Sequence, residues 1–202
     1  AIIDYLDLIK GFNQNELSFY PGSPAVAHKV LRAQDKSWLF ELHPQDHGHL
    51  SNNFRPTRKR KVRKEDGFQG LLGLLPPLSR RACVLIDPPY EIKSDYELVV
   101  KTVAAAYKKF ATGTYMIWYP VVDRERIEKM EASLIESGIK NVHLYELGTS
   151  KDTEEHGMTA SGMIVINPPW NLSNTMDSVM PELVELLSND DGFYRSVELV
   201  SE

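Results

Sequence analysis

The chain has 202 residues, of which 42% are hydrophobic and 25% are charged, as expected for a folded protein of one α/β domain. Its single cysteine, Cys83, excludes a disulfide framework and favours a reducing, cytoplasmic location. No apolar run approaches the ~20 residues of a membrane-spanning helix, so we expect no membrane contact. The net charge of −5 argues against a generally basic surface, but seven of the 23 basic residues fall within residues 55–64.

Two helices are predicted at the start of the chain. Apolar residues in Ile2–Ile9 follow helical spacing, and Gly11 ends the helix. Ser23 and the proline after it predict an N-cap and a first turn, with a helix to about Ala33. A hydroxyl and free backbone N–H groups at that point could also hold a carboxylate or a phosphate.

A strand is predicted at Trp38–Phe40, and Glu41 follows at its carboxyl end. Dinucleotide-type folds bind ribose hydroxyls with an acid at such a position, although no glycine-rich loop precedes it in this sequence. Polar residues that resemble metal ligands come next: His43, Asp46, His47 and His49. No further ligand set accompanies them, so we interpret them as surface residues and predict no metal.

The basic residues of the chain concentrate before its middle. Lys61–Glu65 is predicted as an edge strand, and Asp66-Gly67 as the turn into a helix at Phe68–Leu75. The basic residues within 55–64 either contact phosphates or form a solvated face, and both interpretations stay open. They are Arg55, Arg58, Lys59, Arg60, Lys61, Arg63 and Lys64.

The most informative stretch is the turn after a predicted buried strand at Cys83–Ile86. Asp87 stands at the carboxyl end of that strand, two prolines fix the turn, and Tyr90 follows. The Asp87 carboxylate and the Pro88 carbonyl can accept hydrogen bonds from both N–H groups of an adenine amine. These bonds localise the lone pair of the amine for attack on a sulfonium methyl group. Tyr90 would stack on an unpaired or flipped base. The alternatives are helix capping by Asp87 and a nuclease pattern that would continue into Glu91-Ile-Lys93.

The second half of the chain alternates helices and strands. This alternation predicts a mostly parallel, doubly wound α/β sheet with a C-terminal antiparallel hairpin. In that hairpin we expect 142–147 to be the edge strand and 163–166 to run parallel to 115–119, so that Asn167 faces the same side as Asp87. The predicted elements are helix 94–110, strand 115–119 closed by Pro120, helix 123–137, strand 142–147, polar loop 149–158, strand 163–166, helix 174–187 and strand 196–200.

Seven stretches give the chain a recognisable pattern. They are Tyr20-Pro-Gly-Ser-Pro24, Glu41-Leu-His-Pro44, Asp66-Gly-Phe-Gln69, Ile86-Asp-Pro-Pro-Tyr90, Phe110-Ala-Thr-Gly113, Trp118-Tyr-Pro-Val121 and residues 157–170, from Gly-Met-Thr-Ala-Ser-Gly to Asn-Pro-Pro-Trp. With them the chain resembles the RlmJ-type 23S ribosomal RNA adenine-N6 methyltransferases, which have a Rossmann-like fold.

The resemblance implies S-adenosylmethionine as cofactor and no metal. It implies that Asp87 is catalytic and also contacts the cofactor, together with Ser23, Glu41, Asp66 and Gly67. Glu41 would hold the ribose hydroxyls, and Asp66 would accept a hydrogen bond from the adenine amine of the cofactor. The partner would be 23S ribosomal RNA, free of protein or in an early assembly intermediate, contacted by Arg58, Lys59, Arg60, Lys61, Arg63 and Lys64, and the enzyme would be a cytoplasmic monomer.

The sequence departs from the family at its start. The family's basic N-terminal segment, first strand and glycine-rich cofactor loop have no counterpart here, and the chain begins at Ala1 without a methionine. We therefore expect a single catalytic domain over 1–202 that is incomplete at its N-terminus, with 1–17 the end of a helical insertion. The competing functions are a DNA adenine methyltransferase and a nucleic-acid-binding or DNA-utilisation protein without methyl transfer. Asn167-Pro-Pro-Trp170 is a second candidate for the catalytic turn.

Overall fold

The computed structural model describes residues 1–13, 16–92, 94–152, 157–188 and 190–202. Backbone contacts divide the chain into two compact units, Ala1–Gly73 and Leu74–Glu202, and each is described by itself. Parts of two sequence predictions, the loop at 153–156 and Lys93, lie outside the described residues.

The first unit contains two parallel strands that pair with each other, with Phe40 opposite Arg63. A Cβ atom on Gly70 would lie 2.3 Å from Phe40 Cε1, so only glycine lets the following helix pack this closely on the strand. The predicted N-cap was off by one residue: Gly22 is the N-cap, and Ser23 is the first helical residue. The elements are α1 (Ile2–Lys10), α2 (Ser23–Val30), β1 (Ser37–Phe40), α3 (Pro44–Asn53), β2 (Arg60–Arg63) and α4 (Gly67–Leu74).

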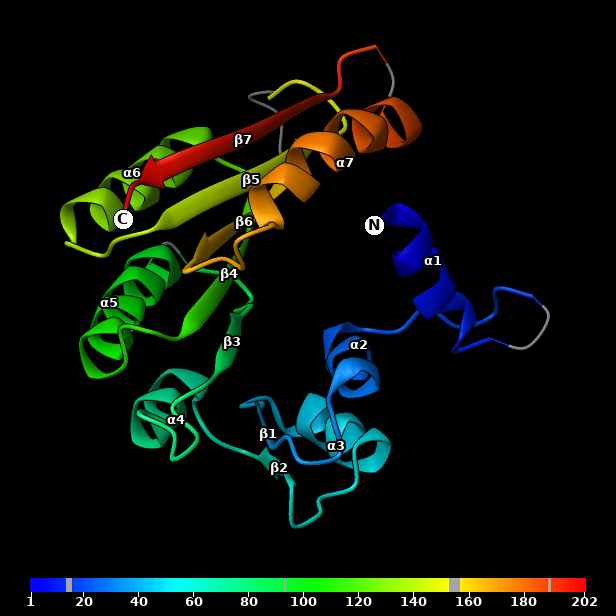
Figure 1. Cartoon of the computed structure of the whole chain (residues 1–202), viewed down its shortest axis with the longest axis vertical. Coiled ribbons are helices and arrows are strands. Elements are labelled where there is room, and N and C mark those ends of the chain that lie inside the picture. The colour runs from blue at the N-terminus through cyan, green and yellow to red at the C-terminus, as the bar shows by residue number, and fades with distance from the viewer. Residues whose placement is uncertain (14–15, 93, 153–156, 189) are drawn as a thin grey trace. The chain divides into compact units, whose positions relative to one another are not determined.

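The second unit is a five-stranded sheet with strand order β3-β4-β6-β5-β7 and helices on both faces (Figure 1). Its elements are β3 (Cys83–Ile86), α5 (Ser94–Lys109), β4 (Thr114–Val121), α6 (Arg124–Glu136), β5 (Val142–Gly148), β6 (Ala160–Ile166), α7 (Leu172–Leu187) and β7 (Phe193–Val200). The α/β class that the sequence predicts is confirmed.

Strand direction gives this sheet two different edges. β3 and β4 are parallel, whereas β4–β6, β6–β5 and β5–β7 are all antiparallel pairs. We call the edge at the carboxyl ends of β3, β4 and β5 the carboxyl edge. The opposite edge, where these strands begin and β6 and β7 end, is the amino edge.

The prediction for the hairpin was wrong in two respects. β6 runs antiparallel to β4, and β5 is not an edge strand because β7 pairs with it. The reason is geometric: a crossover through α6 makes β5 parallel to β4, and a hairpin makes β6 opposite to β5. A strand inserted between β4 and β5 must therefore oppose both. The sheet consequently has fewer parallel pairs than the sequence suggested.

Alternation along β4 defines the packing of the two faces. Tyr115, Ile117 and Tyr119 are fully buried. The hydroxyl group of Tyr115 donates to the carbonyl oxygens of Ala106 and Phe110, which places this face of the sheet against α5. The other face is covered in part by α7, where the hydroxyl groups of Ser173 and Tyr145 lie 3.1 Å apart.

Pro120 does not close β4, contrary to the prediction. It lies inside the strand and pairs with Ser161 of β6. The last residue pair between β3 and β4 is Ile86 with Ile117. At Pro120 no residue of β3 lies beside β4, so no β3 carbonyl requires an N–H group at this position. A proline is therefore tolerated without loss of a ladder hydrogen bond.

Candidate active site

Asp87 lies at the carboxyl edge, directly after the last paired residue of β3. Ile86 is buried, whereas the Asp87 side chain is exposed. No hydrogen bond or ion pair to its carboxylate occurs within the described residues. Partial burial raises the pKa of Asp87 above the usual range for an aspartate. The result is a carboxylate free to accept hydrogen bonds from a ligand and a better proton acceptor than an ordinary aspartate.

Tyr90 anchors the turn that holds Asp87. Its backbone is left-handed, with a φ of 53°, and its ring is only 8% exposed. The ring packs on Tyr96 with centroids 4.6 Å apart and on Trp118 with centroids 6.3 Å apart. Its hydroxyl group donates a 2.6 Å hydrogen bond to the Trp118 carbonyl, just past the end of β3. The hydroxyl thus occupies the position that a further β3 residue would take beside β4, and the predicted stacking on a base stays a prediction.

The predicted cofactor residues of the first unit lie at the carboxyl ends of its two parallel strands. The backbone N–H of Glu41 donates to the Arg63 carbonyl at 3.1 Å, and Glu41 Oε1 accepts a hydrogen bond from the backbone N–H of His43 at 2.8 Å. Asp66 precedes α4, and its Oδ1 atom accepts from the backbone N–H of Phe68 at 2.8 Å. Two carboxylates are therefore fixed at one end of a parallel pair, each with a second oxygen for a ligand.

The other two predicted cofactor residues lie at helix starts. Gly67 is the first residue of α4, where a Cβ atom would lie 3.3 Å from Phe40 Cβ. Ser23 is exposed and makes no capping hydrogen bond to α2. Asp87 belongs to the second unit, so its position relative to these four residues is not described.

The predicted RNA-binding residues fall into two groups. Three have partners within the first unit: Lys59 donates to the Ala33 carbonyl, Arg63 pairs with Glu65 at 3.3 Å, and Arg60 contacts His28 and lies over the Phe54 ring. The side chains of the others are exposed and make no hydrogen bond or ion pair within the described residues: Arg58, Lys61 and Lys64. These three are the candidates for phosphate contacts.

The second proline turn lies at the amino edge, away from Asp87. Asn167 Nδ2 donates to the carbonyl oxygens of Ala111 at 2.7 Å and Gly113 at 2.8 Å. By strand register it is displaced from Asp87 by about 13 Å along the strands and about 10 Å across them, about 16 Å in all. The expectation that Asn167 faces the same side as Asp87 was wrong, because β6 runs in the opposite direction to β3 and β4.

A buried ionic network at the carboxyl edge was missed by sequence reasoning. Glu146 is fully buried in β5 and accepts a 2.8 Å hydrogen bond from the Tyr119 hydroxyl group. Arg124 Nη1 lies 2.8 Å from its Oε1 atom, and Arg195 makes a bidentate contact with Glu131. Arg124 and Arg195 also line a hollow of about 600 Å³. Partners so far apart in the chain leave no local pattern by which the sequence could reveal them.

The histidine-rich segment does not form a metal site. His43 pairs with Asp46 at 3.1 Å, and His47 lies 3.3 Å from the Ser51 hydroxyl group. Within the described ranges no group of three or more His, Cys, Asp or Glu side chains could hold a metal ion. Over the same ranges, no helix is long and apolar enough to cross a membrane.

Comparison with known proteins identifies the family. Residues 1–200 match the family described as ribosomal RNA large subunit methyltransferase D, RlmJ. The chain belongs to this family. RlmJ relatives named ribosomal RNA large subunit methyltransferase J include one from Escherichia coli K12, 49% identical over 89% of this chain and 64% of its own length. Another, from Haemophilus influenzae, is 47% identical over 92% of this chain and 67% of its own length. The chain thus spans about two thirds of these curated relatives.

Solved structures agree with the fold. The crystal structure of protein LPL1258 from Legionella pneumophila has a TM-score of 0.89 and 34% sequence identity, and the match covers 98% of this chain and 73% of that one. A probable spermidine synthase from Corynebacterium glutamicum has a TM-score of 0.60 at 15% identity, over 96% of this chain and 72% of that one. The latter likeness concerns the fold alone.

Proposed function

We propose that the protein transfers a methyl group from S-adenosylmethionine to the N6 amine of an adenine in 23S ribosomal RNA. The observation that carries the proposal is the Asp87 turn in a chain of the RlmJ family. Its carboxylate lies at the carboxyl edge without a partner among the described residues, and a hydrogen bond from the Tyr90 hydroxyl group to the Trp118 carbonyl anchors the turn. The names of the relatives support ribosomal RNA as the substrate.

The chemistry requires an acceptor pair for the amine. The lone pair of an adenine amine is delocalised into the ring, so the amine is a poor nucleophile. Asp87 and the Pro88 carbonyl accept hydrogen bonds from its two N–H groups, which localises the lone pair on nitrogen. The proline turn fixes both acceptors before the base arrives, which reduces the entropy lost on binding. After attack, Asp87 is the nearest group to take the proton that the amine must lose.

The residues of the first unit fit the adenosine part of the cofactor. Carboxylates suit the hydroxyl groups of a ribose and the exocyclic amine of an adenine, and Glu41 and Asp66 present such groups at adjacent strand ends. S-adenosylmethionine supplies an electrophilic methyl group on a sulfonium. Ser23, Gly67 and Asp87 complete the proposed cofactor contacts.

The decisive experiment measures labelled methyl transfer from S-adenosylmethionine by the full-length protein. The substrates are protein-free 23S ribosomal RNA that lacks the modification and a DNA of the same sequence. We expect label in RNA, at N6 of adenine, and none in DNA; label in DNA alone would identify a DNA methyltransferase. Cofactor titration by calorimetry covers the remaining alternative, because a nucleic-acid-binding protein without methyl transfer would not bind S-adenosylmethionine.

A further inference from the structure

The amino edge carries an exposed aromatic turn that the proposed chemistry does not use. Trp170 follows Pro168-Pro169 and is 92% exposed. The turn is fixed from both sides: the backbone N–H of Leu172 donates to the Pro169 carbonyl at 2.9 Å, and the Asn167 carbonyl accepts from the Thr114 hydroxyl group at 2.9 Å. A large aromatic side chain on a rigid backbone can stack on a base with little loss of backbone entropy.

The backbone of this edge is strained. The described non-glycine residues with left-handed backbones include Arg80 with φ of 53°, Asn141 with φ of 54° and Asn167 with φ of 50°. All three lie at the amino edge, where Arg80 precedes β3, Asn141 precedes β5 and Asn167 follows β6. Asparagine tolerates this conformation, but for arginine it is uncommon. Strained residues of this kind tend to occur where they fix the direction of functional side chains.

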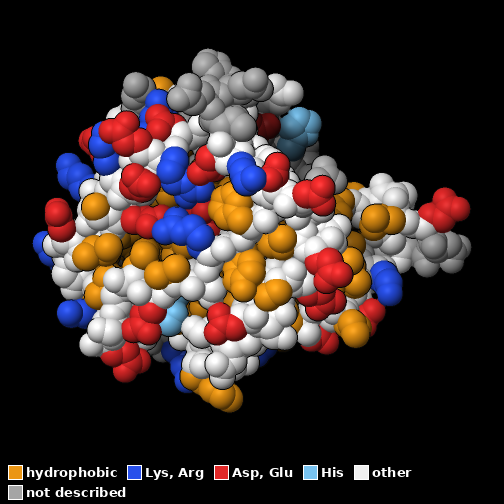
Figure 2. Space-filling model, turned by 90° about the horizontal axis from the view of Figure 1, so that it is seen from above, with side chains coloured by type: hydrophobic (Ala, Val, Ile, Leu, Met, Phe, Trp, Pro, Cys, Tyr) orange, Lys and Arg blue, Asp and Glu red, His pale blue; other side chains and the backbone are white. Residues whose placement is uncertain are grey.

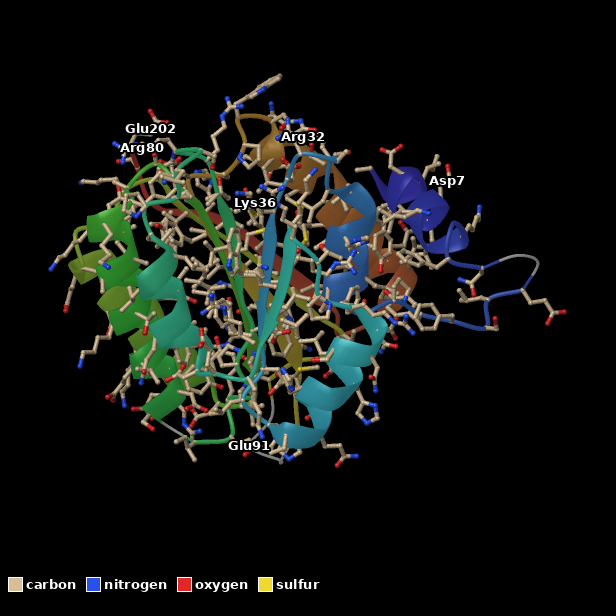
Figure 3. The ribbon with its side chains drawn as sticks, turned by 90° about the horizontal axis from the view of Figure 1, so that it is seen from below. Asp7, Arg32, Lys36, Arg80, Glu91 and Glu202 are labelled. Carbon is tan, nitrogen blue, oxygen red and sulfur yellow. The ribbon has the colours of Figure 1, made fainter. Side chains whose placement is uncertain are left out.

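Four exposed basic residues lie at the same edge as Trp170. Arg80 and Arg81 precede β3, Lys108 lies in the last turn of α5, and Lys140 precedes β5. All four are exposed and have no ion pair within the described residues. Figure 3 shows Arg80 and Glu202 on one side of the second unit and Glu91, which follows the catalytic turn, on the other.

The basic residues of the carboxyl edge are different, because acids neutralise them. Arg124 pairs with Asp152 at 2.6 Å, and Arg195 pairs with Glu131. On the face drawn in Figure 2, basic and acidic side chains lie interspersed. The amino edge thus carries basic side chains without ion pairs among the described residues, with Glu202 as an acidic neighbour near Asn141, together with the exposed Trp170.

We propose that the amino edge is a second RNA-binding surface, on which Trp170 stacks on an unpaired base and Arg80, Arg81 and Lys140 contact phosphates. This proposal rests on RNA being the substrate. The occupant is a segment of the same RNA outside the target loop. Such a segment must reach about 16 Å beyond the catalytic turn, so a minimal stem-loop with the target adenine does not contact this edge while a longer RNA does.

The test compares two RNAs and two charge variants of the full-length protein. The amino-edge variant replaces Arg80, Arg81 and Lys140 by glutamine. The matched control replaces three exposed lysines elsewhere in the second unit, Lys101, Lys129 and Lys151, by glutamine. Affinity for a long 23S fragment and for a minimal stem-loop is measured by fluorescence anisotropy across salt concentrations, and folding is checked by denaturation.

We expect the amino-edge variant to bind the long fragment at least tenfold more weakly. Its salt slope should fall by about two to three units for that RNA. Trp170→Ala should weaken binding of the long fragment about fivefold or more without changing the salt slope. Affinity for the stem-loop and turnover at saturating RNA should stay unchanged, and the control should behave as the unmodified protein.

Equal affinity of the amino-edge variant and the control for the long fragment would overturn the proposal. So would equal losses for the long fragment and the stem-loop, since those would reflect a general charge effect. Selective retention of a ribosomal protein by Trp170, with RNA affinity unchanged, would also overturn it. Failure of the unmodified protein to methylate RNA concerns the proposed function alone, because the binding measurements need no turnover.

Discussion

The substitution Tyr90→Phe separates two roles of one aromatic ring. Phenylalanine stacks on a base as well as tyrosine does, so a role in stacking alone predicts no change. The structure gives the hydroxyl group a separate task, because it donates to the Trp118 carbonyl at 2.6 Å where β3 has ended. Removing that hydroxyl leaves the carbonyl without this partner, while the packing of the ring against Tyr96 remains.

The expected magnitudes follow from that geometry. A buried acceptor that loses its donor costs about 1–3 kcal/mol of unfolding free energy. The same bond fixes the turn that carries Asp87, and a displacement of about 1 Å at a reacting group costs up to about 100-fold in rate. A smaller displacement is expected here, since the two prolines and the packed ring remain. We therefore expect turnover to fall on the order of tenfold, with RNA affinity unchanged.

The assay pairs urea denaturation with labelled methyl transfer at saturating RNA. Tyr194→Phe is the control, because Tyr194 is exposed in β7 and its hydroxyl group makes no hydrogen bond within the described residues. The control should match the unmodified protein in both measurements. If Tyr90→Phe also matched it in both, the hydroxyl would not anchor the turn, and stacking would be the better account of Tyr90.

Four further predictions concern the site and its surroundings. Asp87→Ala should lower turnover about 100-fold or more with the fold intact. Burial raises the pKa of Asp87, so the folded protein loses stability as pH rises through that pKa and the side chain ionises. Asp87→Asn, which cannot ionise, should therefore be at least as stable as the unmodified protein at pH 7. Lower stability of this variant in urea at pH 7 would contradict a raised pKa at Asp87. Asn167→Ala should cost about 1–3 kcal/mol of stability but little turnover per folded molecule, and collapse of turnover in folded protein would move the catalytic role to Asn167. Replacing Arg58, Lys61 and Lys64 by glutamine should reduce the salt slope of RNA binding by up to about three units, whereas an unchanged slope would favour a solvated face.

The sequence predicted local structure well because local rules determine it. The strand at 83–86, the turn at Asp87 and the helix that Gly138 ends, with φ of 78°, all follow from apolar runs, prolines and a glycine. The prediction that Pro120 closes a strand failed because it ignored which strands lie beside β4 at that point. A proline is excluded only where a neighbour requires its N–H, and that neighbour cannot be read from local sequence.

The site could also be predicted only where local sequence was enough. The residue types at Asp87, Glu41 and Asp66 could be found from their positions after strands, and the structure places each at the carboxyl end of a parallel strand or just beyond it. The network around Glu146 could not be found, because the three partners of Glu146 come from other segments of the chain: Tyr119 from β4, Arg124 from α6 and Arg195 from β7. Charge pairing across such separations depends on strand order, which no local pattern encodes.

The two proline turns show how strand direction decides what a motif can do. Each has an apolar strand, a polar side chain and two prolines before an aromatic residue, and each contains a left-handed residue, Tyr90 or Asn167. The prediction that the strand before Asp87 is buried was wrong, because β3 ends the row of strands and only Ile86 of its four residues is buried. In the first turn the Asp87 carboxylate has no partner among the described residues and the Tyr90 ring is buried. In the second turn Asn167 Nδ2 donates two hydrogen bonds and Trp170 is exposed. A catalytic turn needs a free hydrogen-bond acceptor on an anchored backbone. A turn that binds a base needs an exposed aromatic ring on an anchored backbone. Because β6 runs antiparallel to β4, the two similar proline turns lie at opposite edges of the sheet and can serve different chemistry.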